Sequence, residues 1–173
     1  MAEENPMQTI RLEKLVINIG IGSNEQHLNG AKMLIKKLTG KEGVATKSKH
    51  RIPELKLRKG QIIGAMVTLR KKDAEDMLKR ALEASNNTLK ETSIAKNSVN
   101  FGIKEYIEFS GVKYDPKIGM LGMNINAAFS RKGARVERRK RAAAHVGIKH
   151  REIGKELLTQ YISKNFGATV SNE

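Results

Sequence analysis

The sequence contains no cysteine and no tryptophan, and aromatic residues of all kinds make up only 4% of its 173 residues. Without cysteine there is no disulfide framework and no thiolate metal site, which fits a reducing compartment. With so few aromatic residues, the hydrophobic core must be built from aliphatic side chains. No run reaches the roughly 18 apolar residues of a membrane span, and the acidic, polar N-terminus lacks the apolar stretch of a signal peptide. We therefore expect a cytoplasmic protein that has no membrane partner.

Acidic residues are also scarce relative to basic ones. The chain has 33 Lys and Arg against 18 Asp and Glu, a formal charge of +15 and a pI near 10.1. Such an excess repels itself in a compact state unless a polyanion is nearby. Nucleic acid is the commonest partner of so basic a chain, and an anionic membrane surface is the rival. The length suits one domain, so we predict a single nucleic-acid-binding domain over residues 1–173.

Motifs of enzyme chemistry are missing as well. His145 and His150 are not accompanied by carboxylates at metal-ligand spacing, so the sequence predicts no metal site. The stretch Gly20–Ser23 resembles the start of a phosphate loop but lacks the Lys-Ser/Thr ending and the third glycine of a dinucleotide motif. No set of residues indicates nucleophilic or acid–base catalysis. We predict a protein with no catalytic residues, no cofactor and no enzymatic activity.

The hydrophobic periodicity predicts a mixed α+β fold. Alternating apolar residues indicate strands, and apolar residues at spacings of three and four indicate helices. Asp73 is expected to cap the second helix, Gly40 to end the first, and residues 85–97 to form a loop. The predicted strands cover 12–22, 44–49, 61–70, 99–103 with a possible extension to 109, and 123–130, and the predicted helices are centred on 28–38, 74–82 and 153–162. The order β-α-β-β-α-β-β-α favours an antiparallel sheet with helices on one face.

The other face of this sheet is predicted to be open and polar. The side chains that alternate away from the core are Lys14, Asn18, Thr68, Arg70, Asn124, Asn126 and Ser130. Small amides and hydroxyls can bond phosphate oxygens and 2′-hydroxyls at close range, which favours RNA binding. The alternative is an ordinary solvated sheet face. Because the aromatic signature of an RRM is absent, stacking of bases on the sheet is not the expected mechanism.

Two basic segments, one over residues 47–59 and one over 131–151, lie between the predicted elements. The first carries one acid, Glu54, and the second carries Glu137. Their basic residues include Lys47, Lys49, Arg51, Lys56, Arg58 and Lys59, and then Arg131, Arg135, Arg138, Arg139 and Arg141. Charge runs of this kind are often solvated loops, but neutralising phosphates with them releases counterions and adds affinity. We expect them to project as loops at 48–60 and 131–150 and to contact RNA.

Short stretches spread over nearly the whole chain resemble the L-five family of large-subunit ribosomal proteins. They begin with the strand Leu12–Gly22 and continue through Leu38–Lys41, Thr46–Lys49, Leu57–Gly60, Ile63–Gly64, Val67–Arg70, Asn100–Ile103, Tyr114–Pro116 and Ile118–Gly119. The stretch Gly147–Arg151 is more similar to the archaeal and eukaryotic branch than to the bacterial one. Two positions depart from the bacterial pattern: Lys41 stands where Gln is usual, and Asn124 where Asp is common.

The resemblance implies an RRM-like (ferredoxin-like) fold whose open face binds 5S ribosomal RNA. By position, the residues that contact ribosomal RNA would be Lys14, Asn18, Thr46, Lys47, Thr68, Arg70 and Asp115, with Arg131, Arg135, Arg138, Arg139 and Arg141 in an extension embedded in ribosomal RNA. The loop 48–60 resembles the one that reaches peptidyl-site tRNA, so Lys49, Arg51, Lys56, Arg58 and Lys59 would contact that tRNA.

The expected partners are therefore 5S rRNA, large-subunit rRNA, peptidyl-site tRNA and other ribosomal proteins, with the free protein a monomer. A general basic DNA-binding or chromatin-like protein is the alternative that charge alone permits. Modules that read a DNA groove present a helix or a ribbon, whereas here the polar groups lie on a sheet face. The pattern therefore favours the ribosomal function.

Overall fold

Strand β1 (Ile10–Gly20) lies at the centre of a five-stranded antiparallel sheet, in a computed structural model that describes residues 5–22 and 26–171. The order across the sheet is β2 (Val44–Lys47), β3 (Ile62–Leu69), β1, β6 (Met123–Arg131) and β5 (Ser98–Ile103). When the edge strand β5 is set aside, the chain order β1-α1-β2-β3-α2-β6 and the sheet order β2-β3-β1-β6 are those of a ferredoxin-like fold. The predicted α+β, ferredoxin-like architecture is therefore confirmed.

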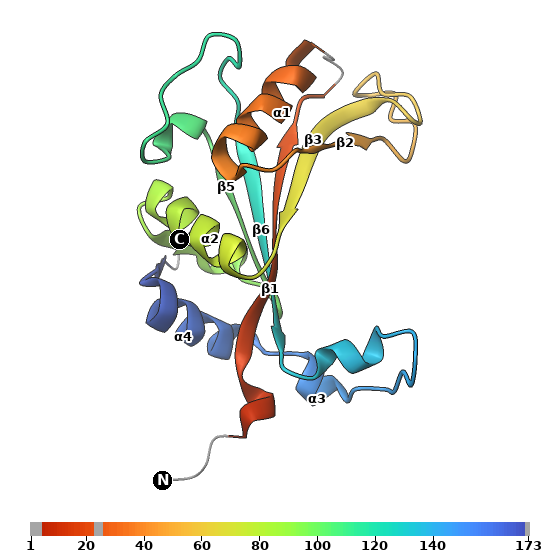
Figure 1. The fold of residues 1–173 in the computed structure, drawn as a ribbon, viewed down its shortest axis with the longest axis vertical. Coiled ribbons are helices and arrows are strands. Elements are labelled where there is room, and N and C mark those ends of the chain that lie inside the picture. Colours follow the sequence, from red (N-terminus) through yellow and green to blue (C-terminus); the bar gives the residue numbers. More distant parts are fainter. Residues whose placement is uncertain (1–4, 23–25, 172–173) are drawn as a thin grey trace.

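Three helices supply the apolar layer that covers one face of this sheet. They are α1 (Gln26–Thr39), α2 (Lys72–Ala84) and α4 (Lys155–Phe166). A further short helix, α3 (Ile148–Arg151), precedes α4 in the chain. Their buried residues, among them Leu34, Leu78 and Leu158, belong to one cluster with the inward residues of the strands, such as Ile17 and Ile125. Figure 1 shows α2 and α4 stacked on the same side of the sheet. One continuous core thus leaves the opposite face uncovered.

Single-turn 3-10 helices occur at Pro6–Gln8, Glu91–Ser93, Tyr106–Glu108 and Ala134–Glu137. None of the helices in residues 5–22 and 26–171 is long and apolar enough to cross a membrane.

Several local expectations from the sequence were wrong. Residues 85–97 are not wholly a loop, because β4 (Thr88–Lys90) pairs in parallel with β7 (Thr169–Ser171). The strand that begins at Ser98 ends at Ile103 and does not extend to residue 109. In the last helix the sequence predicts an apolar side formed by Ile153, Leu157, Tyr161 and Ile162. In α4 the buried residues are Leu158 and Ile162, whereas Leu157 is 47% exposed.

The start of α2 also differs from the prediction. Lys71 occupies the N-cap, with no side-chain cap, and Asp73 lies inside the first turn. The Asp73 carboxylate instead accepts a hydrogen bond from Lys41 Nζ at 2.5 Å. This hydrogen bond and the charge of Lys41 lower the pKa of Asp73 below its ordinary value. Lys41 therefore links the end of α1 to the start of α2, away from the open face.

Candidate nucleic-acid interface

The strand register sets the side chains of the uncovered face in rows, with amides on the central strands and the apolar residues Val44 and Met66 toward the β2 edge. One row runs across all five strands through Val44, Met66, Asn18, Asn124 and Gly102. The next row contains Thr68, Val16, Asn126 and Asn100. Because neighbouring strands lie about 4.8 Å apart, adjacent amides in a row are within reach of one nucleotide. The face is therefore shallow, polar and close to the backbone.

Glycines hollow this face further. A Cβ on Gly64 would lie 2.5 Å from the carbonyl oxygen of Ile19 and 3.0 Å from Thr46 Oγ1, so only glycine allows β2, β3 and β1 to pack this tightly. A hollow of about 250 Å³ is lined by Asn18, Asn100, Phe101, Gly102, Asn124 and Asn126. In the portion of the chain that the structure describes, the amides of Asn18, Asn124 and Asn126 form no side-chain hydrogen bond. Each amide is free to donate and accept at once.

The first basic segment forms a hairpin of its own between β2 and β3. Ile52 and Leu57 exchange backbone hydrogen bonds at 3.1 and 3.0 Å, and Ser48 pairs with Gln61 and Gly60 at its base. Leu57 is only 6% exposed although it is outside the main core, because the hairpin packs on itself. The predicted tRNA-contacting residues, Lys49, Arg51, Lys56, Arg58 and Lys59, are all exposed. Figure 1 shows this loop extending away from α2 and α4.

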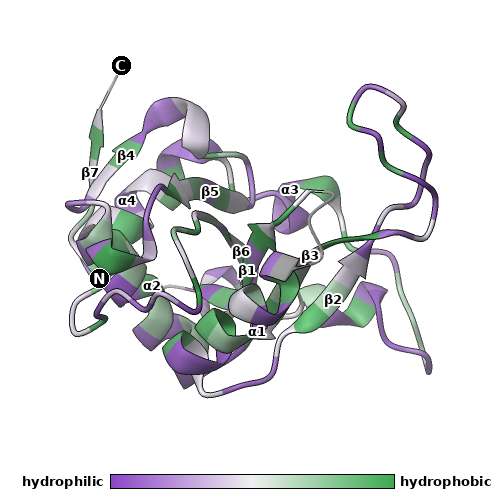
Figure 2. Cartoon of the chain, turned by 90° about the horizontal axis from the view of Figure 1, so that it is seen from above, coloured by the Kyte–Doolittle hydropathy of each residue, from purple (hydrophilic) through white to green (hydrophobic). Residues whose placement is uncertain are grey.

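The second basic segment follows β6 and is held to the sheet by hydrogen bonds at both of its ends. Arg131 Nη1 donates to the Lys149 carbonyl, and His150 Nε2 lies 3.0 Å from the Lys132 carbonyl oxygen. Asn97, which directly precedes β5, also binds the C-terminal end of this segment. Its Nδ2 donates to the Arg151 carbonyl and its Oδ1 accepts from the Ile153 N–H, each at 2.9 Å. Figure 2 shows that this segment and the first hairpin both project on the side away from α4.

The structure brings several of the predicted RNA-contacting residues onto the open face of the sheet. Lys14, Asn18, Thr46 and Thr68 lie on the open face, and the basic segment begins at the end of β6. Arg70 directly follows the end of β3 and lies beside Arg11 and Lys71 in a surface hollow. Lys47, Arg135, Arg138, Arg139 and Arg141 are exposed. Ser130, predicted to be open, is instead 6% exposed, because the following segment covers it. Arg131 is half-buried and its guanidinium is used for internal bonding.

Asp115 is the predicted contact that the structure does not bring to the open face. Its Oδ1 accepts from the Lys117 N–H, its own N–H donates to the hydroxyl of buried Tyr106, and its carbonyl accepts from Ile118. The same loop packs on α1, where Ile118 O lies 3.1 Å from the Cβ position of Gly30. Asp115 therefore holds a turn on the helical side.

Asn100 and Arg11 were missed as candidates from the sequence. Asn100 lies beside Asn126, and Arg11 is exposed next to Ser130 at the other end of β1. Asn100 lies between Val99 and Phe101, the alternating apolar residues of the predicted strand 99–103, so the alternation places Asn100 on the opposite side of that strand.

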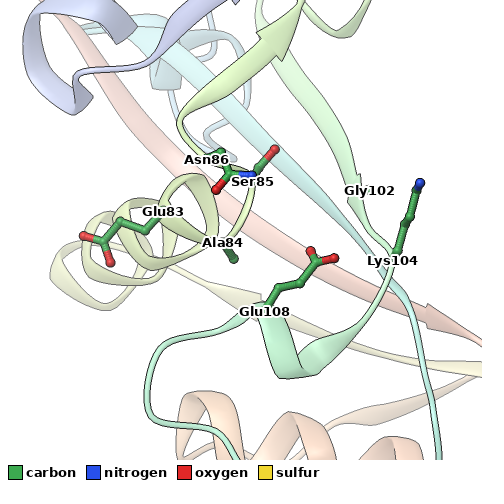
Figure 3. Close-up of a pocket in the computed structure, with 7 residues that line it drawn as sticks. All are labelled: Glu83, Ala84, Ser85, Asn86, Gly102, Lys104 and Glu108. Carbon is green, nitrogen blue, oxygen red and sulfur yellow. The ribbon is translucent and has the colours of Figure 1, made fainter.

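A hollow beyond the edge of β5 has a different character. It measures about 470 Å³ and lies between the end of α2 and β5, with Glu83, Lys104 and Glu108 in its lining. Figure 3 shows the Glu108 side chain extending toward this gap. With two carboxylates and one ammonium, this hollow disfavours a phosphate.

Comparison with known proteins gives two adjoining family matches. The model described as Ribosomal protein L5 matches residues 5–58, and the model for the C-terminus of the same ribosomal family matches residues 62–169. Neither part forms the sheet alone, because β1 from the first lies between β3 and β6 from the second. The junction between the matches lies at the end of the basic hairpin.

Individual relatives match nearly the full chain. "Large ribosomal subunit protein uL5" of Sulfurisphaera tokodaii is 41% identical over 96% of this chain and 94% of its own length. The protein of the same name from Pyrobaculum aerophilum is 41% identical over 98% of this chain and 95% of its own length. The one from Nanoarchaeum equitans is 39% identical over 96% of this chain and 99% of its own length. From matches that extend from β1 to β7, the chain belongs to the ribosomal protein L5 family, in its archaeal-like branch.

Proposed function

We propose that this protein is a structural component of the large ribosomal subunit that binds 5S rRNA, attaches it to the large-subunit rRNA and contacts peptidyl-site tRNA. As a member of the ribosomal protein L5 family it is a structural protein and not an enzyme. The observation that carries the RNA assignment is the open face, where unpaired amides lie between two basic segments.

Each part of this surface suits a separate task in binding RNA. Asn18, Asn124 and Asn126 present donors and acceptors at fixed spacing, which suits recognition of a folded RNA. The exposed guanidinium groups of residues 135–141 can bind backbone phosphates of RNA irrespective of the base sequence. The face therefore supplies selectivity, and the basic segments supply salt-dependent affinity.

The basic hairpin supports the contact with tRNA. It has its own hydrogen bonds and its own buried residue, Leu57, so it presents Arg51, Lys56 and Arg58 on a defined scaffold. Because it joins β2 to β3 outside the core cluster, it can reach a partner other than the RNA on the sheet. In this proposal the protein is a cytoplasmic monomer when free and works bound to the ribosome beside other ribosomal proteins.

A competition assay tests the assignment. Labelled 5S rRNA bound to the full chain is displaced by unlabelled 5S rRNA, tRNA or duplex DNA at one fixed salt concentration. We expect an equimolar complex that tRNA and duplex DNA displace only at much higher concentration. Equal displacement by duplex DNA would favour the general DNA-binding alternative and contradict the proposal.

A further inference from the structure

A basic hollow lies where β1, β6, the start of α2 and the segment after β6 meet. It measures about 590 Å³, and its lining includes Arg11, Arg70, Lys71, Ser130, Arg135 and Arg138. Two carboxylates, Glu13 and Glu75, are also in the lining. The hollow is at the end of the open face, outside the rows of amides. It joins residues far apart in the sequence, so no single motif reveals it.

The cations of this hollow exceed what its carboxylates can neutralise. Arg138 is ion-paired with Glu13. In residues 5–22 and 26–171, no ion pair is formed by Arg11, Arg70, Lys71 or Arg135, and Glu75 is the remaining carboxylate of the lining. Arginine presents paired N–H groups that match two oxygens of a phosphate. The uncompensated charge therefore favours an anion with several oxygens.

The start of α2 borders the hollow, because Lys71 and Glu75 are in its lining. The N–H groups of Ala74 and Glu75 already donate to the Lys71 carbonyl, so the donors that this helix start can offer are those of Lys72 and Asp73. The helix has 13 residues, and its N-cap, Lys71, has a φ of 59° and provides no side-chain cap. Uncapped N–H groups at a helix start carry partial positive charge and bind phosphates. Asp73 in this turn is already paired with Lys41.

Ser130 gives an independent indication of a ligand. Ser130 is 6% exposed and lines the hollow, and its Oγ has no hydrogen-bond partner among the described residues. Buried hydroxyl groups are nearly always paired. Ser130 lies opposite Arg11 in the strand register, so an oxygen held by Arg11 is close to the Ser130 hydroxyl.

We propose that this hollow binds one phosphate group and that, in the assembled particle, the group is a backbone phosphate of ribosomal RNA. The second half of this inference rests on the proposed function. Arg11 of β1 and Arg70, which follows the end of β3, bind the phosphate together, and the first N–H groups of α2 donate to it from the helix. The hollow thus fixes the RNA in register at the end of the amide face.

The RNA arm of the test measures the salt dependence of 5S rRNA binding for Arg11→Gln/Arg70→Gln. If both arginines hold one phosphate, the double variant loses roughly 0.7 to 0.9 units of slope in total, the contribution of a single phosphate. Two independent surface contacts would lose about twice that, which overturns the proposal of one shared phosphate. An unchanged slope rejects the RNA assignment. Lys79→Gln/Lys164→Gln, which removes two exposed lysines of α2 and α4, is the matched control and should leave the slope unchanged.

The second arm titrates the full ¹⁵N-labelled chain with inorganic phosphate at constant ionic strength. Saturable shifts at the amides of Lys72 and Asp73, lost in the double variant, support the phosphate site. Their absence in the parent chain overturns it. Saturation by phosphate together with an unchanged RNA slope would identify free phosphate as the ligand and reject the RNA assignment. If the parent chain fails to bind 5S rRNA but saturates with phosphate, the proposed function fails while the phosphate site stands.

Discussion

Asn97 is predicted to be the residue that fastens the second basic segment to the sheet. Its side chain spans two backbone groups on the far side of that segment, the Arg151 carbonyl and the Ile153 N–H. The Ile153 side chain is 3% exposed, so the N–H that Asn97 satisfies lies at the edge of the core. The change Asn97→Ala removes both hydrogen bonds, and the alanine side chain has no donor or acceptor to replace them.

The expected cost follows from these two bonds. An ordinary hydrogen bond contributes about 1 kcal/mol, and a partly buried donor left unpaired costs roughly 1–3 kcal/mol. For Asn97→Ala we expect the free energy of unfolding to fall by about 2 kcal/mol. In a chain of this size that lowers the melting temperature by roughly 4–8 °C.

The assay is thermal and urea denaturation of the free protein, combined with limited trypsin digestion at a temperature where both variants are folded. Asn100→Ala is the matched control, because the Asn100 side chain is exposed and bonds only to Ser98 Oγ at 3.3 Å. We expect this control to change stability by less than about 0.5 kcal/mol. Faster cleavage within residues 131–151 should accompany Asn97→Ala. Equal stability of the two variants, with equal cleavage, would refute the fastening role.

Three further predictions concern the interface. Asn18→Ala/Thr68→Ala should weaken 5S rRNA binding with little change in salt slope, whereas neutralising Arg135, Arg139 and Arg141 should lower the slope by roughly 2 to 3 units. Equal slopes for the two variants would contradict the division of tasks between face and segment. Deleting residues 51–56 should leave folding and 5S rRNA binding intact and lower the affinity of reconstituted ribosomes for peptidyl-site tRNA; unchanged tRNA binding would reject that contact, and lost 5S incorporation would assign the hairpin to the 5S interface. Gly64→Ala should destabilise the fold by roughly 1–3 kcal/mol, because its Cβ would lie 2.5 Å from a backbone oxygen. The Cβ of Gly102→Ala would lie 3.2 Å from the Asn124 side chain and 3.9 Å from the Met123 carbonyl oxygen, so this change should cost less in the same denaturation measurement.

The long elements of the fold were predictable because their periodicity is local. The alternation around Ile17 and the helical spacing around Leu34 each bury one continuous side, so the elements and the open face follow from the sequence. The short strands β4 and β7 were not predictable, since three-residue strands carry little periodicity and Thr88 pairs with Thr169 across the chain. In α4 the choice between Leu157 and Leu158 depends on how the helix is rotated against the sheet.

The residues of the candidate site also fall into those that the sequence predicts and those that only the structure reveals. Lys14, Asn18 and Thr68 were found by alternation, which is a property of each strand by itself. The burial of Ser130 and the use of Asp115 inside a turn depend on which loops fold over them, and a single strand gives no sign of that. The basic hairpin was predicted as a projecting loop, but its backbone pairing between Ile52 and Leu57 was visible only in the structure.

The most direct test of the central claim observes the side-chain amides of the open face. The NH₂ resonances of Asn18, Asn124 and Asn126 in the full ¹⁵N-labelled chain are recorded before and after addition of one equivalent of 5S rRNA. Asn29 and Asn165, exposed on α1 and α4, serve as internal controls. We predict large shifts for the three face amides and small ones for the two controls. Shifts confined to the helical asparagines, or unchanged face amides in a fully formed complex, would contradict binding of 5S rRNA on the open sheet.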